Sequence, residues 1–210
     1  MTVLLLANEE QKDELLSCPL DDAIRLKWVK KPEDILAIEP VDACIDLLFE
    51  NTKERISWLQ HLDSPLILVN LVIETLQQIQ LPFIRINGWN TFLKRPVVEA
   101  ASTDTSLRKK AEGFFAHLGR RIEWVADIPG FITPRVVASI INEAFFTLQE
   151  NVSSREDIDT AMKLGTNYPF GPFEWGEKIG LRNIYSLLET LGQKQNRYNP
   201  APLLKQTALA

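Results

Sequence analysis

The change of pattern that decides the fold lies at residues 127–149, which read DIPGFITPRVVASIINEAFFTLQ. Pro129 and Gly130 interrupt regular structure, and Pro134 suits the first turn of a helix. Beyond Pro134, apolar residues recur at helical spacing. We therefore predict one long helix from Pro134 to Asn151, with a domain boundary before it at residues 127 and 128.

Upstream of this boundary, short apolar runs alternate with helix-like runs. The first run, Val3–Ala7, is continuously apolar, which is typical of a strand buried on both faces. Further strands are expected at 24–29, 43–49, 65–70, 83–86, 97–100 and 121–125. Helices are expected at 9–17, 51–62, 73–80 and 105–118. This alternation predicts a mostly parallel sheet covered by helices over residues 1–127.

Downstream of the long helix the chain reads as helical throughout. Ser153 and Ser154 precede Glu156 and Asp157, which is a helix-start signal with acids in the first turn. A turn rich in glycine and proline follows at 165–172, and two more helices are expected near 173–179 and 181–191. The tail after residue 192 is polar. The predicted fold class is therefore α/β for residues 1–127 and all-α for residues 128–210.

Composition excludes several classes of protein. The net charge of −5 argues against a nucleic-acid partner, and no apolar run approaches the ~18–20 residues of a membrane span. The opening residues read as a buried strand and not as a signal peptide. Cys18 and Cys44 form no redox or metal motif, so we expect two core thiols in a cytoplasmic protein. His61 and His117 are too few for a histidine metal site, and no metal is expected.

Five motifs follow one another in the second half of the chain. They are DIPGFI at 127–132 with Arg135, NEA at 142–144, EDIDTAMKLG at 156–165, YPFGPFE at 168–174 and IGL at 179–181. In this order they resemble the 3-hydroxyacyl-CoA dehydrogenase family. The resemblance begins near Ala43 and is strongest after residue 127. It implies a reduced Rossmann-like domain and then a helical domain like that of 6-phosphogluconate dehydrogenase, which makes the contact of a homodimer.

The resemblance implies NAD as the family's cofactor, but this chain lacks the residues that hold it. A Rossmann site needs glycines after the first strand, because only a bare backbone can approach the pyrophosphate. Here the first glycine is Gly88, and the first strand is followed by Glu9 and Glu10, whose charges would repel phosphates. The second strand ends in Lys30 and Lys31, where an acid would bind the ribose. We therefore expect no cofactor.

The family's catalytic segment, H-F-F-N-P-x(7)-E, aligns with residues 87–99. Asn87 then stands at the position of the family's histidine, whereas Asn90 and Glu99 match the motif. An asparagine cannot accept a proton near neutral pH, and loss of a general base typically costs about 10²–10⁴-fold in rate. The family's S-N-T-S turn reads VNLV at 69–72, without a hydroxyl, and Pro134 replaces a substrate-binding asparagine.

The remaining candidate site consists of Glu99 as acid or base, Asn87, and Asn90 and Arg85 as binders of an acidic small molecule. Asn87 follows a strand end, where ligands bind in open parallel sheets. We therefore expect a cleft between the two domains that also includes Pro134. The family's helical insertion that helps to hold CoA is absent, since only 32–42 bridge the second and third strands.

Three functions stay open at this point. The first is a family member without conventional dehydrogenase activity that acts as a dimeric binding or interaction module. The second is an active 3-hydroxyacyl-CoA dehydrogenase of fatty-acid metabolism with altered residues. The third is a different enzyme for small acids that uses Glu99. Glu99 could also be an inherited carboxylate without a role.

Overall fold

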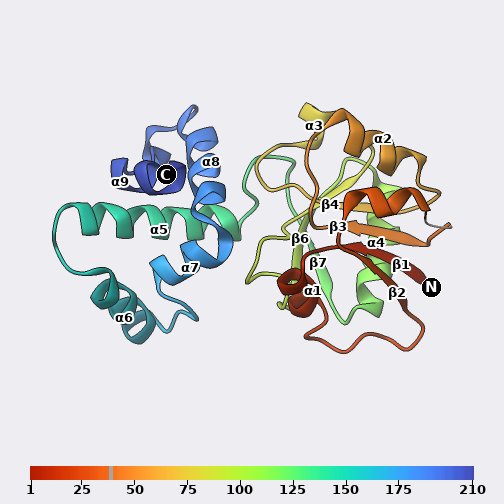
Figure 1. Cartoon of the computed structure of the whole chain (residues 1–210), viewed down its shortest axis with the longest axis horizontal. Helices are drawn as coiled ribbons and strands as arrows, with labels where there is room; N and C mark the ends of the chain where they lie inside the picture. The colour runs from red at the N-terminus through yellow and green to blue at the C-terminus, as the bar shows by residue number, and fades with distance from the viewer. Residues whose placement is uncertain (38–39) are drawn as a thin grey trace. The chain divides into compact units, whose positions relative to one another are not determined.

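The computed structural model describes residues 1–37 and 40–210, with the backbone alone for 35–37. The chain divides into two compact units, Met1–Phe131 and Ile132–Ala210. The first unit alternates strands and helices, and the second contains only helices among the described residues (Figure 1). The predicted fold class, α/β followed by all-α, is confirmed.

The first unit is a twisted seven-stranded sheet with helices on both sides. The strand order is β2-β1-β3-β4-β5-β6-β7, and every neighbouring pair is parallel except β5 and β6. Its elements are β1 (Thr2–Leu6), α1 (Glu9–Leu15), β2 (Arg25–Val29), η1 (Pro32–Ala37), β3 (Ala43–Asp46), α2 (Lys53–His61), β4 (Ile67–Asn70), α3 (Leu76–Ile79), β5 (Ile84–Ile86), β6 (Val97–Ala101), α4 (Thr105–His117) and β7 (Arg121–Trp124).

The sheet is buried on both faces because successive side chains of a strand point to opposite sides. In β1, Leu5 packs into a core with Leu15 of α1 and Phe115 of α4. Its neighbour Leu4 packs into the other core with Leu59 of α2 and Leu76 of α3. This two-sided burial explains why β1 is apolar at every position.

The second unit is a helical bundle around a long helix. Its elements are α5 (Thr133–Gln149), α6 (Arg155–Thr166), α7 (Pro172–Ile179), α8 (Leu181–Gly192), η2 (Asn196–Tyr198) and α9 (Pro202–Leu209). Ser154 caps α6 by accepting a hydrogen bond from the N–H of Asp157, as the sequence predicts. Asp159 of α6 caps α7, since its carboxylate accepts from the N–H groups of Phe173 and Glu174 at 2.8 and 3.2 Å.

Three predicted elements differ from the structure. The strand expected at 43–49 ends at Asp46, whose carboxylate accepts the N–H of Leu48 and turns the chain. The helix expected at 73–80 is only Leu76–Ile79, because Thr75 forms its cap. The polar tail contains a helix, α9, that the sequence analysis missed. The buried Leu204 anchors it.

The two cysteines lie in different surroundings. Cys44 is a core thiol as predicted, and burial raises its pKa. The prediction was wrong for Cys18, which is half-buried in the loop after α1 with its Sγ 4.0 Å from the carbonyl of Lys94. Among the described residues, no helix combines the length and apolar character needed to cross a bilayer.

Candidate functional site

Side-chain amides join the carboxyl ends of β1, β3, β4 and β5. Gln11 Nε2 and Asn70 Nδ2 both donate to the carbonyl oxygen of Leu47, at 3.1 and 3.2 Å. Asn70 Oδ1 in turn accepts the N–H of Gly88 at 3.0 Å. We call Gln11, Asn70, Leu47 and Gly88 the amide network. It lies at the sheet edge beyond which ligands bind in open α/β folds.

The amide network is closely packed at Gly88. A Cβ atom added at this position would lie 2.8 Å from Leu47 Cδ2 and 2.9 Å from the Asn70 side chain. Both distances are shorter than a carbon–carbon contact permits. Glycine is therefore required here so that β5 can continue past Asn70, and the close approach serves the chain's own packing.

The start of α1 is capped by the chain itself. Asn8 Oδ1 accepts the N–H of Gln11 at 2.8 Å, while Gln11 Oε1 accepts the N–H of Asn8 at 3.2 Å. Glu9 and Glu10 occupy the first turn, as predicted, and Glu9 pairs with Lys30 at 2.5 Å. The N–H groups and positive dipole end that bind phosphate in a Rossmann site already have these partners.

Trp28 lies beside this helix start and connects β2 to β1. Its Nε1 donates to the carbonyl of Ala7 at 2.9 Å. The ammonium groups of Lys12 and Lys30 lie 3.8 and 4.8 Å from the centre of the indole ring. The lysines that follow β2 therefore do not form a simple solvated pair, because Lys30 is held by Trp28 and Glu9.

Asn87 and Glu99 are neighbours across β5 and β6. The N–H of Asn87 donates to the backbone carbonyl of Glu99 at 3.0 Å, continuing the antiparallel register of these strands. Both residues are buried, with 5% and 8% of their surface exposed. Glu99 is thus not a solvated edge carboxylate. Its catalytic assignment remains a prediction.

The loop after Asn87 is held by two carboxylates of α1. Asn90 Nδ2 donates to Glu10 Oε2 at 2.9 Å, and the N–H of Thr91 donates to both oxygens of Glu14 at 2.7 and 2.8 Å. Burial raises the pKa of Glu14, although this hydrogen bond opposes the shift. Thr91 has a φ of +78°, a strained value for a β-branched residue. The assignment of Asn90 to substrate binding remains a prediction.

Arg85 is fully buried and bonded to the protein. Its Nε donates to the carbonyl of Leu71 at 3.0 Å, and its Nη2 to those of Val72 and Ile128 at 3.1 and 3.2 Å. Its Nη1 pairs with Asp127 Oδ1 at 2.8 Å. The prediction that Arg85 binds an acidic ligand does not fit this arrangement, because its side chain is 0% exposed.

The partners of Arg85 show what it does instead. Asp127 and Ile128 belong to the segment that follows β7, and the guanidinium also lies 4.3 Å from the ring centre of Phe131. The N–H of Gly130 donates to the carbonyl of Val72 at 2.8 Å. Arg85 therefore fixes the last residues of the first unit against the loop after β4.

A buried ion pair at the end of β3 escaped the sequence analysis. Arg55 Nε lies 2.8 Å from Asp46 Oδ2, and Arg55 Nη2 donates to Asp46 Oδ1 and to the carbonyl of Leu48, both at 3.0 Å. Burial raises the pKa of Asp46 to about 6 despite the nearby guanidinium. An aspartate inside an apolar strand was the available signal, because a buried carboxylate needs a partner.

The histidines lie apart from these features. His117 Nδ1 contacts Asp21 at 2.9 Å, and His61 Nδ1 contacts the carbonyl of Ser57 at 2.6 Å. Neither histidine has a printed contact with Glu99 or Asn87. Within the described part of the chain, no group of three or more histidine, cysteine, aspartate or glutamate side chains could hold a metal ion.

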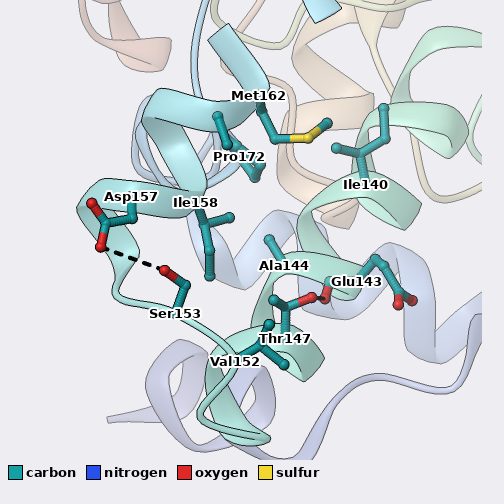
Figure 2. A pocket seen from close by; sticks show the side chains of 11 residues that line it. Ile140, Glu143, Ala144, Thr147, Val152, Ser153, Asp157, Ile158, Met162 and Pro172 are labelled. Carbon is teal, nitrogen blue, oxygen red and sulfur yellow. Dashed lines mark hydrogen bonds between the residues drawn. The ribbon is translucent and has the colours of Figure 1, made fainter. Parts of the chain in front are cut away.

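The helical unit carries two hollows along α5. The first, of about 390 Å³, lies between α5 and α6 and is mostly apolar. Figure 2 shows Ile140, Ala144 and Thr147 of α5 around this hollow with Ile158 and Met162 of α6. The second, of about 360 Å³, is lined by Arg135, Val136, Ser139, Ile140, Glu143 and Tyr198.

Comparison with known proteins gives a consistent result. The family model described as 3-hydroxyacyl-CoA dehydrogenase, C-terminal domain, matches residues 130–210. The 3-hydroxyadipyl-CoA dehydrogenase of Escherichia coli K12 is 44% identical over 115 residues, which are 54% of this chain and 24% of that protein. The 3-hydroxybutyryl-CoA dehydrogenase of Bradyrhizobium diazoefficiens is 38% identical over 110 residues, 51% of this chain and 38% of that protein.

A solved structure extends the likeness to the whole fold. The (S)-3-hydroxybutyryl-CoA dehydrogenase of Ralstonia eutropha superposes with a TM-score of 0.72 over 98% of this chain and 92% of that one, at 22% identity. At this identity the likeness concerns the fold. The matched segments span well under half the length of the two relatives named above.

Proposed function

The chain belongs to the 3-hydroxyacyl-CoA dehydrogenase family, and from this premise we propose that it is a dimeric binding or interaction module without conventional NAD-dependent dehydrogenase activity. The two units have separate tasks in this proposal. The first unit is a self-closed scaffold, and the second unit makes the protein–protein contact.

The amide network is the observation that carries the proposal. A dinucleotide site needs free backbone N–H groups at the first helix and an open edge at the strand ends. Here Asn8 and Gln11 cap that helix, and Gln11 and Asn70 tie the strand ends to Leu47. A pyrophosphate would have to displace these bonds and approach two carboxylates. These residues do not fit NAD.

The position of the family's general base supports the same proposal. Dehydrogenation of a secondary alcohol needs a group that removes the hydroxyl proton, and Asn87 has no such basic atom. Asn87 is also buried and its N–H serves the β5–β6 pairing. A hydride step through this site would therefore lack both its acceptor's binding loop and its base.

Titration with NADH and NADPH tests this proposal directly. The chain is expected to show no energy transfer from tryptophan to the nicotinamide up to millimolar dinucleotide, and calorimetry is expected to show no heat of binding. Trp28 lies beside the helix start, so it would report binding there. A micromolar dissociation constant for either dinucleotide would overturn the proposal.

A second candidate, an enzyme acting on small acids, has one observation in its favour. Glu99 is a mostly buried carboxylate next to a strand end, and its charge acts on Arg95. Thermal-shift screening of small carboxylic acids against the chain and its Glu99→Gln variant separates the candidates. Stabilisation that is lost in Glu99→Gln would favour the enzyme.

The partner in this proposal is a second copy bound through the helical unit. Two exposed apolar side chains near the start of α5, Ile132 and Val136, and the apolar hollow beside α6 support it. Light scattering at micromolar concentration is expected to give twice the chain mass of 23.9 kDa. A monomer under these conditions would remove the dimer from the proposal.

A further inference from the structure

One face of α5 is uncovered along most of its length. Ile132, at the cap, and Val136 are 51% and 55% exposed, and Ser139 and Glu143 are also exposed. Steps of three and four residues place these side chains on a single side of the helix. The opposite side is buried in the unit's own core, through Val137, Ala138, Ile141 and Phe145. The uncovered face therefore contributes nothing to the fold of its own unit.

This face is hollowed at its middle. The 360 Å³ hollow is lined by Arg135, Val136, Ser139, Ile140 and Glu143 of α5, so that Ser139 is its central residue. Its neighbour, the 390 Å³ apolar hollow, shares Ile140 and Glu143 with it (Figure 2). A small residue at the centre lets another helix approach closely, at the ~8–10 Å axial separation of packed helices.

The charges on α5 are reversed relative to its dipole. Acids stabilise a helix start and bases a helix end. The first turn of α5 has no acid but carries Arg135, and Glu143 and Glu150 lie toward its other end. Ile132 gives the helix no side-chain cap. This arrangement costs stability in an isolated helix, but it becomes favourable beside an antiparallel helix with the same sequence.

We infer that the partner on this face is a second copy of the chain, with two α5 helices antiparallel about a two-fold axis at Ser139. Arg135 and Glu143 are each four residues from Ser139, so the axis brings Arg135 of one copy to Glu143 of the other, twice per dimer. The start of each helix then lies beside the end of its partner, and Val136 faces the partner's hollowed surface. Such an interface is self-complementary, as a two-fold contact requires.

This inference rests on the proposed dimer and adds its axis. A Ser139→Cys variant in a Cys18→Ser background tests the axis, because facing residues of closely packed helices meet the Cα separation of a disulfide, ~4.4–6.8 Å. Cys44 is buried and stays out of reach. Mild oxidation is expected to convert most of the protein to a covalent dimer. A Gln206→Cys control, exposed on α9, is expected to stay uncrosslinked.

Charge reversal gives a second, independent readout. Arg135→Glu or Glu143→Arg places like charges together twice in the dimer, so each is expected to raise the dissociation constant about tenfold or more. The double variant restores both pairs and is expected to return to within about threefold of the unchanged chain. Circular dichroism checks that each variant is folded.

The outcomes separate the two proposals. A monomeric unchanged chain would overturn the proposed dimer and this inference together. A dimer that Ser139→Cys does not crosslink, and whose dissociation constant neither charge reversal changes, would overturn the axis alone and leave the proposed function in place.

Discussion

Replacing Arg55 by methionine should destabilise the first unit strongly, although no ligand or surface is touched. The side chains of Arg55 and Asp46 are 4% and 0% exposed, and they meet through two contacts of 2.8 and 3.0 Å. Methionine fills much of the arginine's volume but leaves the carboxylate unpaired. Breaking a buried pair from one side typically costs about 3–5 kcal/mol, and we expect a loss in this range at pH 8.

The loss should depend on pH, with a sign that follows from Asp46. Burial raises its pKa from the ordinary 3.8 to about 6 even beside Arg55. The folded chain therefore holds this proton more tightly than the unfolded chain. Its contribution to stability is complete below about pH 4 and is lost as the pH rises through about 6. Without the guanidinium the pKa rises further, so the deficit of Arg55→Met should shrink from pH 8 to pH 5.

Urea unfolding at pH 5 and pH 8 measures both effects. Tryptophan fluorescence reports mainly on the first unit, which holds Trp28, Trp58, Trp89 and Trp124. Coincidence with circular dichroism checks for a single transition. Asp46→Leu combined with Arg55→Met removes both charges and should recover most of the loss.

The matched control is Arg121→Met, since Arg121 is an exposed arginine of β7. It should change the free energy of unfolding by less than about 0.5 kcal/mol. If Arg55→Met loses less than about 1 kcal/mol at pH 8, or loses the same amount at both pH values, the account of the pair is refuted.

Three further substitutions follow from close contacts. In Gly171→Ala the new Cβ would lie 2.3 Å from the Asp159 side chain that caps α7, so urea unfolding of the helical unit should show a loss of about 2–4 kcal/mol; an unchanged midpoint would contradict this. Thr91→Gly removes the cost of a φ of +78° while keeping the N–H that Glu14 binds, so unfolding should show a gain of up to ~1 kcal/mol, and a clear loss would count against stored strain. Arg85→Met leaves three carbonyls and a carboxylate without their donor, so limited proteolysis should cut the segment near residue 128 faster than in the unchanged chain; equal cleavage rates would argue against the clamp.

The local patterns of the sequence determined the two-part architecture. A strand buried on both faces must be apolar at every position, and Val3–Ala7 shows this directly. The change to helical spacing after Pro134 likewise marks α5, because one buried stripe repeats every three to four residues. Ser154 announced the start of α6, since a cap acts on amides only two or three residues away.

Elements with weaker local signals were misjudged for the same reason. The short helix α3 depends on the cap at Thr75, and α9 depends on Leu204, a single buried anchor in a polar segment. A strand of mixed polarity ended early because Asp46 turns the chain at Leu48. In each case the deciding contact was too short or too isolated to form a periodic pattern.

The roles of the polar residues were decided by tertiary structure. The sequence placed Asn87 near Glu99 only through a family motif, and the pairing of β5 with β6 made them neighbours. Arg85 read as a ligand-binding cation, yet the fold surrounds it with four acceptors that lie 13 to 43 residues away in the chain. Gln11 gave no signal, and folding carried the carbonyl of Leu47 to it. Periodicity reports which side of an element is buried, but the partner of a buried polar group is set by chain segments that meet only in the folded state.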